Sequence, residues 1–396
     1  MNVSTMRWID RFVGIPLCLI AGLWRRAGSK LRGAGAGERS PVVVVIKMFG
    51  LGSILLSFPF LTELRRFSPG ARIVFVTFAS NAPMLERLPF HVDVVTIRTS
   101  SFTAFAADAV LAIRRLQRLR PRAVFDLEFF SKFSTLLSTL TGAPKRHGYD
   151  LAARWRRLNV TERVPYRDNL HMTEIFLSQL PSGTAVPESI SVEMRKPTER
   201  ERQSILRTLA GEGLDQRRIV GVNINAGTTS LDRRWPGDRF AETLLTYLGR
   251  NPETAVVLTG DATERRYVQD FLDAHPVLAD KAWNFAGRIS LGEFTALVER
   301  MEWLLSNDSA PMHIAAALGT PVIALFGPES PVMYGPPGKA TILYAGLACS
   351  PCLSVYRAKQ FHCPYNALCM RSIPPTDVLR AIREIETVEQ ARSARA

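Results

Sequence analysis

The 396-residue chain lacks any apolar run of the roughly 18–20 residues that a membrane-spanning helix needs, which excludes a polytopic membrane protein. Cysteine is scarce, and five cysteines are too few to build a disulfide scaffold of this size, so we expect a reducing compartment. Acidic residues are outnumbered: 36 Asp and Glu face 50 Lys and Arg, for a net charge of +14. This balance favours anionic partners, namely nucleic acid, an acidic membrane surface or phosphorylated substrates.

The first forty residues have a composition of their own, with seven basic and two acidic residues. Residues 12–24 carry no charge, and Trp8 and Trp24 flank this run as interfacial tryptophans do. The run is too short to cross a bilayer, so we expect residues 1–40 to associate with an anionic membrane surface and to end in a flexible hinge. A helix docked on the protein's own surface and a cleaved signal peptide are the alternatives, although Arg25 and Arg26 directly after the run argue against export.

Two stretches of alternating strands and helices follow. The first, residues 41–180, opens with Val42–Ile46, an unbroken apolar run typical of a strand buried on both faces. After a connection at 181–216 that is rich in Pro, Gly, Ser and charged residues, the alternation restarts at Ile219 and continues to residue 375. This spacing predicts an α/β fold with two Rossmann-like domains facing a cleft, and a C-terminal helix or tail at 376–396.

Three loops of the second half follow predicted strands, where ligands bind in open parallel sheets. Residues 225–236 offer a glycine, hydroxyls and guanidiniums to phosphate oxygens, or form a solvated loop that Trp235 anchors. Residues 258–265 hold acidic groups that suit a ribose diol, although Asp261 can equally cap the following helix. Residues 306–313 end a strand and open a helix, so their N–H groups suit an anion. His313 in this third loop is either a ligand contact or a buried polar residue of the helix.

In their order along the chain, these motifs resemble those of glycosyltransferase family 9, typified by ADP-heptose:lipopolysaccharide heptosyltransferases. Residues 47–52, Lys-x-x-Gly-x-Gly, are similar to the family's opening strand and turn, and residues 227–236 to its phosphate loop. Residues 307–321 resemble its Asn-Asp-Ser-Gly-x-x-His signature, and Phe-Gly-Pro at 326–328 completes a match over 41–375. The resemblance implies a GT-B fold and an inverting transfer that needs no metal or other cofactor. The implied donor is a nucleotide-sugar, ADP-heptose, and the implied acceptor is an anionic, lipid-linked glycan of the lipopolysaccharide type.

The same resemblance assigns roles to individual residues. The implied donor-binding residues are Thr228, Thr229, Arg233, Glu264, Asp308, Ser309, Ala310 and His313. The expected contacts of the acidic acceptor are Gly52, Lys132, Lys145 and Arg146. The basic residues among them can equally be a solvated face. We expect an enzyme that is peripheral on the cytoplasmic face of the cell membrane.

Ser53 departs from the family pattern. Heptosyltransferases of the family carry an Asp here as the general base, and a serine hydroxyl cannot take a proton at neutral pH without a base of its own. Glu128, after the predicted strand 123–127, is the nearest alternative carboxylate, so Ser53 and Glu128 are the candidate catalytic residues. A catalytically inactive, nucleotide-sugar-binding scaffold and a sugar-nucleotide epimerase of similar fold are the competing functions. A nucleic-acid-binding protein has only the net charge in its favour, and we expect no nucleic-acid partner.

Four of the five cysteines lie close together near the C-terminus. They follow the spacing Cys349-x2-Cys352-x10-Cys363-x5-Cys369. Structural zinc usually takes two tight pairs, whereas this pattern has one tight and one loose pair. Zinc, a disulfide and reduced packing cysteines all stay open for this cluster, and the predicted site has no metal.

Overall fold

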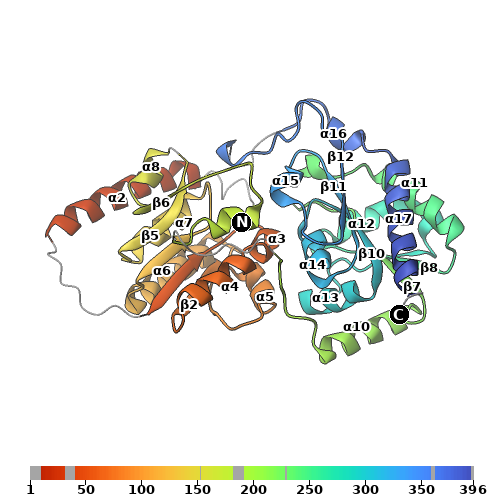
Figure 1. Cartoon of the computed structure of the whole chain (residues 1–396), viewed down its shortest axis with the longest axis horizontal. Coiled ribbons are helices and arrows are strands. Elements are labelled where there is room, and N and C mark those ends of the chain that lie inside the picture. Colours follow the sequence, from red (N-terminus) through yellow and green to blue (C-terminus); the bar gives the residue numbers. More distant parts are fainter. Residues whose placement is uncertain are drawn as a thin grey trace. The chain divides into compact units, whose positions relative to one another are not determined.

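A computed structural model describes residues 10–31, 41–151, 153–181, 191–227, 230–357 and 362–393 of the chain. The chain forms two compact units, Met1–Glu193 and Met194–Ala396, and each contains one parallel six-stranded sheet with helices on its faces (Figure 1). The predicted α/β fold with two Rossmann-like domains is therefore confirmed.

The sheet of the first unit has the strand order β3-β2-β1-β4-β5-β6. Its central strand, β1, consists of the five apolar residues predicted for a strand buried on both faces, and all five are buried. The strands are β1 (Val42–Ile46), β2 (Arg72–Phe78), β3 (Asp93–Ile97), β4 (Ala123–Asp126), β5 (Lys145–Asp150) and β6 (Glu162–Pro165). The helices are α2 (Gly14–Leu31), α3 (Leu51–Leu55), α4 (Phe58–Phe67), η1 (Ala79–Asn81), α5 (Ala82–Leu85), α6 (Phe102–Leu119), α7 (Lys132–Leu140), α8 (Arg154–Arg157) and α9 (Met172–Leu177).

The loop from β4 to α7 lies at the carboxyl end of this sheet. Residues 127–131 connect the two elements, and the Oγ atom of Ser131 accepts the backbone N–H of Ser134 at 3.1 Å. This hydrogen bond caps the first turn of α7 and fixes where the helix begins. The loop therefore presents its side chains next to the turn that follows β1, because β1 and β4 are parallel neighbours.

The second unit repeats the architecture with the strand order β12-β11-β10-β7-β8-β9. Its strands are β7 (Arg218–Asn223), β8 (Thr254–Leu258), β9 (Ala282–Asn284), β10 (Met301–Asn307), β11 (Val322–Phe326) and β12 (Ala340–Tyr344). Its helices are α10 (Glu199–Gly211), η2 (Leu231–Arg233), α11 (Gly237–Arg250), α12 (Arg265–Ala274), η3 (Pro276–Leu278), α13 (Leu291–Glu299), α14 (Ala310–Leu318), α15 (Pro331–Tyr334), η4 (Val355–Arg357), α16 (Leu368–Arg371) and α17 (Pro375–Ser393). The helix in the predicted connection, α10, packs against α13 and so belongs to this unit.

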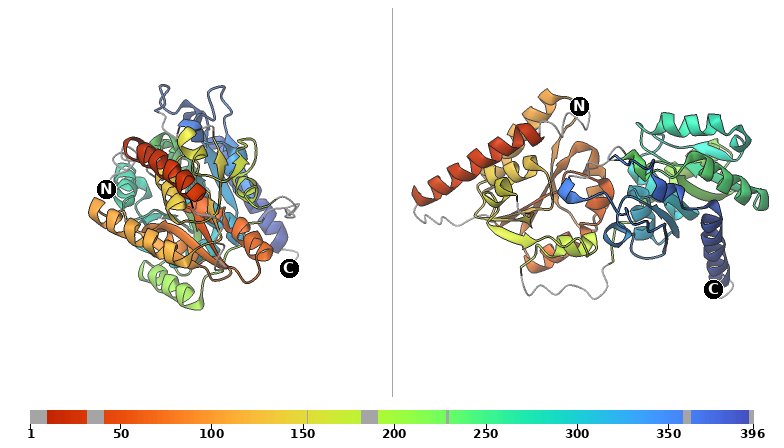
Figure 2. Two further views of the ribbon diagram at one scale, coloured as in Figure 1. Left: turned by 90° about the vertical axis from the view of Figure 1, so that its left-hand side faces the viewer. Right: turned by 90° about the horizontal axis from the view of Figure 1, so that it is seen from above.

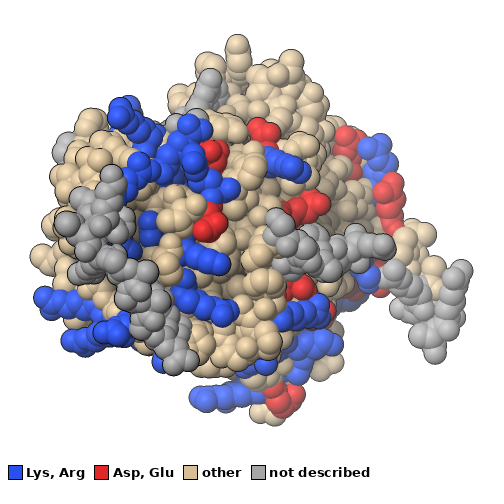
Figure 3. Space-filling model, turned by 60° about the vertical axis from the view of Figure 1, so that its left-hand side comes forward, with Lys and Arg blue, Asp and Glu red and all other residues tan. Residues whose placement is uncertain are grey.

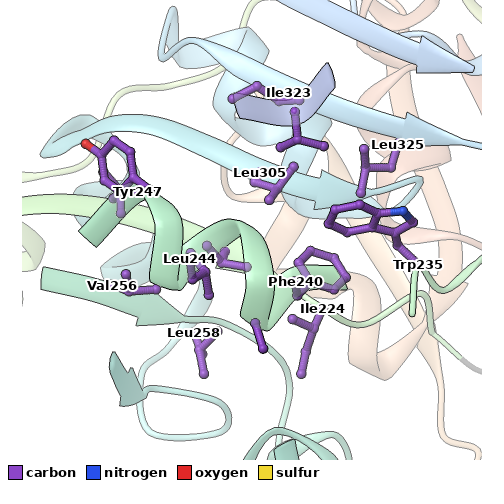
Figure 4. Packing of buried hydrophobic residues seen from close by; sticks show 14 of the residues in the cluster. Ile224, Trp235, Phe240, Leu244, Tyr247, Val256, Leu258, Leu305, Ile323 and Leu325 are labelled. Atoms are coloured by element: carbon purple, nitrogen blue, oxygen red, sulfur yellow. The ribbon is translucent and has the colours of Figure 1, made fainter. Parts of the chain in front are cut away.

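The core of the second unit lies between its sheet and helices α11 and α17 (Figure 4). Trp235 is 1% exposed and packs edge-to-face on Phe240, with ring centroids 4.9 Å apart. Its Nε1 atom donates a hydrogen bond to the carbonyl of Ile373 at 3.0 Å. A buried indole whose N–H has a partner is a stable anchor, so Trp235 fixes the end of the loop that precedes α11.

Helix α2 packs on the first unit beside α7 and α8 (Figure 2). It contains Cys18, which is fully buried, and its first turn lies next to Lys132 at the start of α7. Of the helices in the described ranges, none is long and apolar enough to cross a membrane. The docked helix that the sequence left as an alternative is therefore present over Gly14–Leu31.

Candidate active site

Two buried asparagines join the loops at the carboxyl end of the second sheet. The Nδ2 atom of Asn307 donates to the carbonyls of Ile224 at 2.9 Å and Asn225 at 3.2 Å, and its Oδ1 atom accepts the N–H of Trp235 at 2.9 Å. The Nδ2 atom of Asn225 donates to the carbonyl of Thr259 at 2.8 Å. These bonds hold together the three loops that the sequence analysis selected, and neither asparagine was assigned this role from the sequence.

Arg233 and Asp308, both of which are expected to bind the donor, meet at this end of the sheet. The Nη1 atom of Arg233 donates to Oδ2 of Asp308 at 3.1 Å and to its carbonyl at 2.9 Å, while Nη2 donates to the carbonyl of Ala226. The two charged side chains are 14% and 7% exposed. The guanidinium is thus held in one orientation at the mouth of the loops, with Asp308 occupying part of its donor set.

The start of α14 supplies hydroxyl and N–H groups beside this ion pair. The Oγ atom of Ser309 accepts a hydrogen bond from Nδ2 of Asn223 at 2.7 Å, and Ala310 opens the helix. The first N–H groups of a helix have no partner within the helix and are suited to anions. His313 lies one turn further and is buried. Residues 228 and 229, the two predicted threonine contacts, lie outside the described residues.

Glu264 and Asp261 lie in the turn that follows β8. The Oε2 atom of Glu264 accepts the N–H of Asp261 at 3.0 Å, and burial raises the pKa of Glu264. The Oδ1 atom of Asp261 accepts the N–H groups of Thr263 at 2.7 Å and Glu264 at 3.1 Å, so it stabilises the turn before α12, whose own N-cap residue is Glu264. Close by, Thr259 Oγ1 and Asn225 Oδ1 are buried without a hydrogen-bond partner among the described residues.

Glu128 lies at the carboxyl end of the first sheet and holds the loop that follows β1. Its Oε1 atom accepts three hydrogen bonds, from Nζ of Lys47 at 2.8 Å and from the N–H groups of Met48 at 2.7 Å and Phe49 at 2.9 Å. The Lys47 and Glu128 side chains are 3% and 1% exposed, so this is a buried ion pair. The Oε2 atom accepts no hydrogen bond from the described residues. One carboxylate oxygen is structural, and the other has no partner in the described part of the chain.

A second buried ion pair, between Arg156 and Asp126, holds the backbone of the loop that contains Glu128. The Nη2 atom of Arg156 lies 3.3 Å from Oδ2 of Asp126, and the same guanidinium donates to the carbonyls of Glu128 and Phe129. Burial raises the pKa of Asp126 to about 6. This ion pair was not predicted from the sequence. The one residue that could have indicated it is Asp126, an aspartate at the end of an apolar strand.

Gly52, Ser53 and Lys132 follow β1 or β4 and so lie at the same end of the sheet as Glu128. Gly52 and Ser53 lie in α3, directly after β1, and Lys132 opens α7. Ser53 is half-buried, and its hydroxyl makes no hydrogen bond to the described residues. Lys132 forms an ion pair with Asp10 at 3.5 Å.

The other two predicted acceptor contacts lie at the opposite end of the sheet. Lys145 and Arg146 open β5, and the parallel pairing of β5 with β4 places them at the amino end. Lys145 is exposed, whereas Arg146 is buried and donates to the carbonyls of Asn159 at 2.7 Å and Ala143 at 2.6 Å. Burial lowers the pKa of Arg146 to about 10. The structure therefore separates these two residues from Gly52, Ser53 and Glu128.

The four late cysteines surround one small cavity of the second unit. Cys349, Cys352, Cys363 and Cys369 all line it, and all four are free thiols. The backbone N–H of Cys363 donates to Oδ2 of Asp232 at 3.0 Å, which ties this segment to the loop before α11. Across the described ranges, no three His, Cys, Asp or Glu side chains are placed to hold a metal ion.

Comparisons with known proteins bear on the family and the fold. The sequence model of glycosyltransferase family 9 (heptosyltransferase) matches residues 117–361. Lipooligosaccharide heptosyltransferase 2 of Haemophilus influenzae is 38% identical over 114 residues, which are 28% of this chain and only about a third (32%) of that relative's length. Two solved structures share the fold. E. coli ADP-heptose lipopolysaccharide heptosyltransferase II has a TM-score of 0.69 and 22% identity, over 88% of this chain and 99% of that one. E. coli heptosyltransferase WaaC with ADP has a TM-score of 0.61 and 18% identity, over 87% and 99%.

Proposed function

Since the chain belongs to glycosyltransferase family 9, we propose that it is an enzyme that transfers a sugar from a nucleotide-sugar to a lipid-linked acceptor of the lipopolysaccharide type. The proposed sugar is heptose, as the name of the family indicates. The observation that carries the proposal is the set of loops at the carboxyl end of the second sheet, where Arg233, Asp308, Glu264 and the start of α14 come together.

The second unit is the proposed donor site. A nucleoside diphosphate needs cationic and N–H donors for its phosphates and a carboxylate for its ribose diol. Arg233 and the first N–H groups of α14 supply the former, and Glu264 supplies the latter. ADP in the structure of WaaC, which shares the fold, supports adenosine diphosphate as the carrier.

The first unit is the proposed acceptor site, with Glu128 as the general base. In an inverting transfer, the acceptor hydroxyl oxygen bonds to the anomeric carbon while the bond from that carbon to the diphosphate breaks. The nucleoside diphosphate leaves with the electron pair, and the acceptor proton passes to Oε2 of Glu128, the carboxylate oxygen without a partner. In this proposal, which uses no metal, the first N–H groups of α14 beside the Arg233–Asp308 pair stabilise the charge that develops on the leaving group. The proposed location is the inner face of the cell membrane, where a lipid-linked acceptor is found.

A nucleotide-sugar-binding scaffold without catalytic activity is the second candidate. Ser53 favours it, because this position carries the base in heptosyltransferases of the family, and so does the structural use of Oε1 of Glu128. The donor site is the same in both proposals. They differ in whether a proton acceptor operates in the first unit.

Thermal-shift titration with ADP, GDP, UDP and CDP tests the donor site. A ligand at one hundred times its dissociation constant adds about 2.7 kcal/mol of stability. We expect ADP alone to stabilise the chain and Arg233→Ala to abolish this shift. Arg266→Ala is the matched control, because that arginine lies on α12 of the same unit and its side chain is 92% exposed. No shift with any of the four nucleotides contradicts both candidates. A shift with ADP, together with full transfer activity in Glu128→Gln, contradicts the assignment of the base.

A further inference from the structure

Helix α2 packs on the first unit through a stripe of small residues. Gly14 and Gly22 contact the body so closely that an added Cβ atom would lie 2.7 Å from Cβ of Lys132 and 2.8 Å from Cβ of Leu158. Between them, Sγ of Cys18 donates to the carbonyl of Lys132 at 3.3 Å. Larger side chains do not fit at these positions, so the stripe determines which side of the helix faces the protein.

The opposite side of α2 and the residue just before it carry large apolar side chains that are at least 42% exposed. At 100° per residue, these side chains fall on one continuous arc away from the small-residue stripe. We call them the outer ridge; they are Val13 (44% exposed), Leu17 (42%), Ile20 (64%), Leu23 (59%) and Trp24 (66%). Single exposed apolar residues are normal on soluble proteins, but four on one side of a helix, with a fifth directly before it, mark an interaction surface.

Basic side chains lie where α2 meets the first unit. Helix α2 contains no acidic residue, and Asp10 just before it pairs with Lys132. At the other end of α2, Nη2 of Arg25 donates to the carbonyl of Ala143, two residues before the exposed Lys145. Basic side chains are abundant on the face of the first unit that Figure 3 turns to the viewer. An apolar arc next to cations is the pattern of helices that lie in the interface of an anionic bilayer.

The arginines of α6 extend this charge. Gln117 of α6 donates to the carbonyl of Leu140, at the end of α7, so the last turns of the two helices are neighbours. Arg114 and Arg118 in these last turns of α6 are exposed and make no ion pair in the described chain. They are therefore placed to reach anionic headgroups.

We propose that the outer ridge of α2 inserts into an anionic lipid surface while its small-residue stripe stays docked on the first unit. The inference deepens the proposed function, on which it rests for the lipid-linked nature of the acceptor. The first turn of α7 shows what the docking achieves: Oδ1 of Asp10 accepts the N–H groups of Lys132 at 3.0 Å and Phe133 at 2.9 Å. Asp10, just before α2, is thereby fixed at Lys132, which is four residues from Glu128 in the chain. An inserted ridge therefore holds the carboxyl end of the first sheet at the lipid surface.

Cosedimentation of the full chain with vesicles tests the proposal. The probes are vesicles of phosphatidylcholine alone and vesicles with about one third phosphatidylglycerol. We expect the native chain to bind the anionic vesicles. In Ile20→Ala/Trp24→Ala the partition coefficient should be at least about tenfold lower, because the binding free energy lost with two inserted apolar side chains exceeds that of a tenfold change. Arg114→Gln/Arg118→Gln should lower binding to anionic vesicles by about tenfold and leave binding to neutral vesicles unchanged.

Val277→Ala/Val332→Ala is the matched control, since these side chains are 74% and 61% exposed in the second unit and should leave vesicle binding unchanged. All variants alter exposed positions, so their melting temperatures and ADP shifts should equal those of the native chain. Equal vesicle binding by Ile20→Ala/Trp24→Ala and the native chain overturns the proposal. The proposal is also overturned if the native chain does not bind vesicles but self-associates, and Ile20→Ala/Trp24→Ala restores the monomer. That result would identify a second copy of the chain as the partner of the ridge. A normal ADP shift alongside either result leaves the donor site intact and locates the failure in the membrane inference.

Discussion

The buried pair of Lys47 and Glu128 should be among the largest single electrostatic contributions to the stability of the first unit. Both side chains are almost fully buried, and Oε1 of Glu128 also accepts two backbone N–H groups. Removing one partner of a buried pair leaves the other charge uncompensated and typically costs about 3–5 kcal/mol. We expect Glu128→Gln and Lys47→Met each to destabilise β1 and β4 by about 3 kcal/mol, the lower end of the range. The remaining groups keep some partners: Lys47 still donates to the carbonyl of Phe49 at 2.6 Å.

The double variant distinguishes this pair from two independent contributions. Because neither charge is left alone in Lys47→Met/Glu128→Gln, its cost should fall short of the sum of the single costs by about 1–3 kcal/mol. Hydrogen exchange of peptides from β1 and β4 in increasing urea measures the local free energy of opening in the full chain. The comparison is Lys339→Met, which breaks a pair with Glu389 whose side chains are 43% and 40% exposed and should cost less than about 1 kcal/mol. Single costs below 1 kcal/mol that simply add would refute the reasoning.

Three further results are expected. Trp235→Phe should destabilise the second unit by about 1–2 kcal/mol in urea unfolding, because it deletes the donor to the Ile373 carbonyl, and an unchanged midpoint would contradict the anchor. Burial lowers the pKa of His147 to about 4 from 6.5, so stability should be complete above pH 6.5 and fall by at most about 3 kcal/mol as the pH drops to 4. His147→Phe should flatten that acid limb, and an unaltered limb would assign it to other groups. A thiol reagent should modify the exposed Cys349 in the native chain and reach the buried Cys369 only on unfolding, and equal rates would contradict this.

The sequence predicted those parts of the fold whose signal is local. The strand Val42–Ile46 was predicted because an unbroken apolar run signals burial on both faces. The strand β5, Lys-Arg-His-Gly-Tyr-Asp, was not predicted because its residues are mostly polar. Without β5, nothing in the sequence showed that Lys145 and Arg146 start a strand and so lie at the amino end of the sheet.

The candidate site was predictable where a contiguous motif carries it and not where distant residues meet. The family signature located Arg233 and Asp308 in the chain, and the structure brings them together. The partners of Glu128 and Asp126 were not predictable, because 81 residues separate Lys47 from Glu128 and 30 separate Asp126 from Arg156. A charged residue at the end of a strand indicates a possible site, but only the tertiary structure shows whether a counter-charge is buried with it.

The anchoring of Trp235 also has a consequence for the time at which the donor loop can form during synthesis. Its indole N–H and Nη1 of Arg239 both donate to the carbonyl of Ile373, which is 138 residues further along the chain than Trp235. At a ribosomal rate of about 5–20 residues per second, that carbonyl is made roughly 7–28 seconds after the tryptophan. In a nascent chain stopped before residue 373, Asn307 can already hold the loop before α11, but the indole of Trp235 does not yet have the carbonyl of Ile373 to bond.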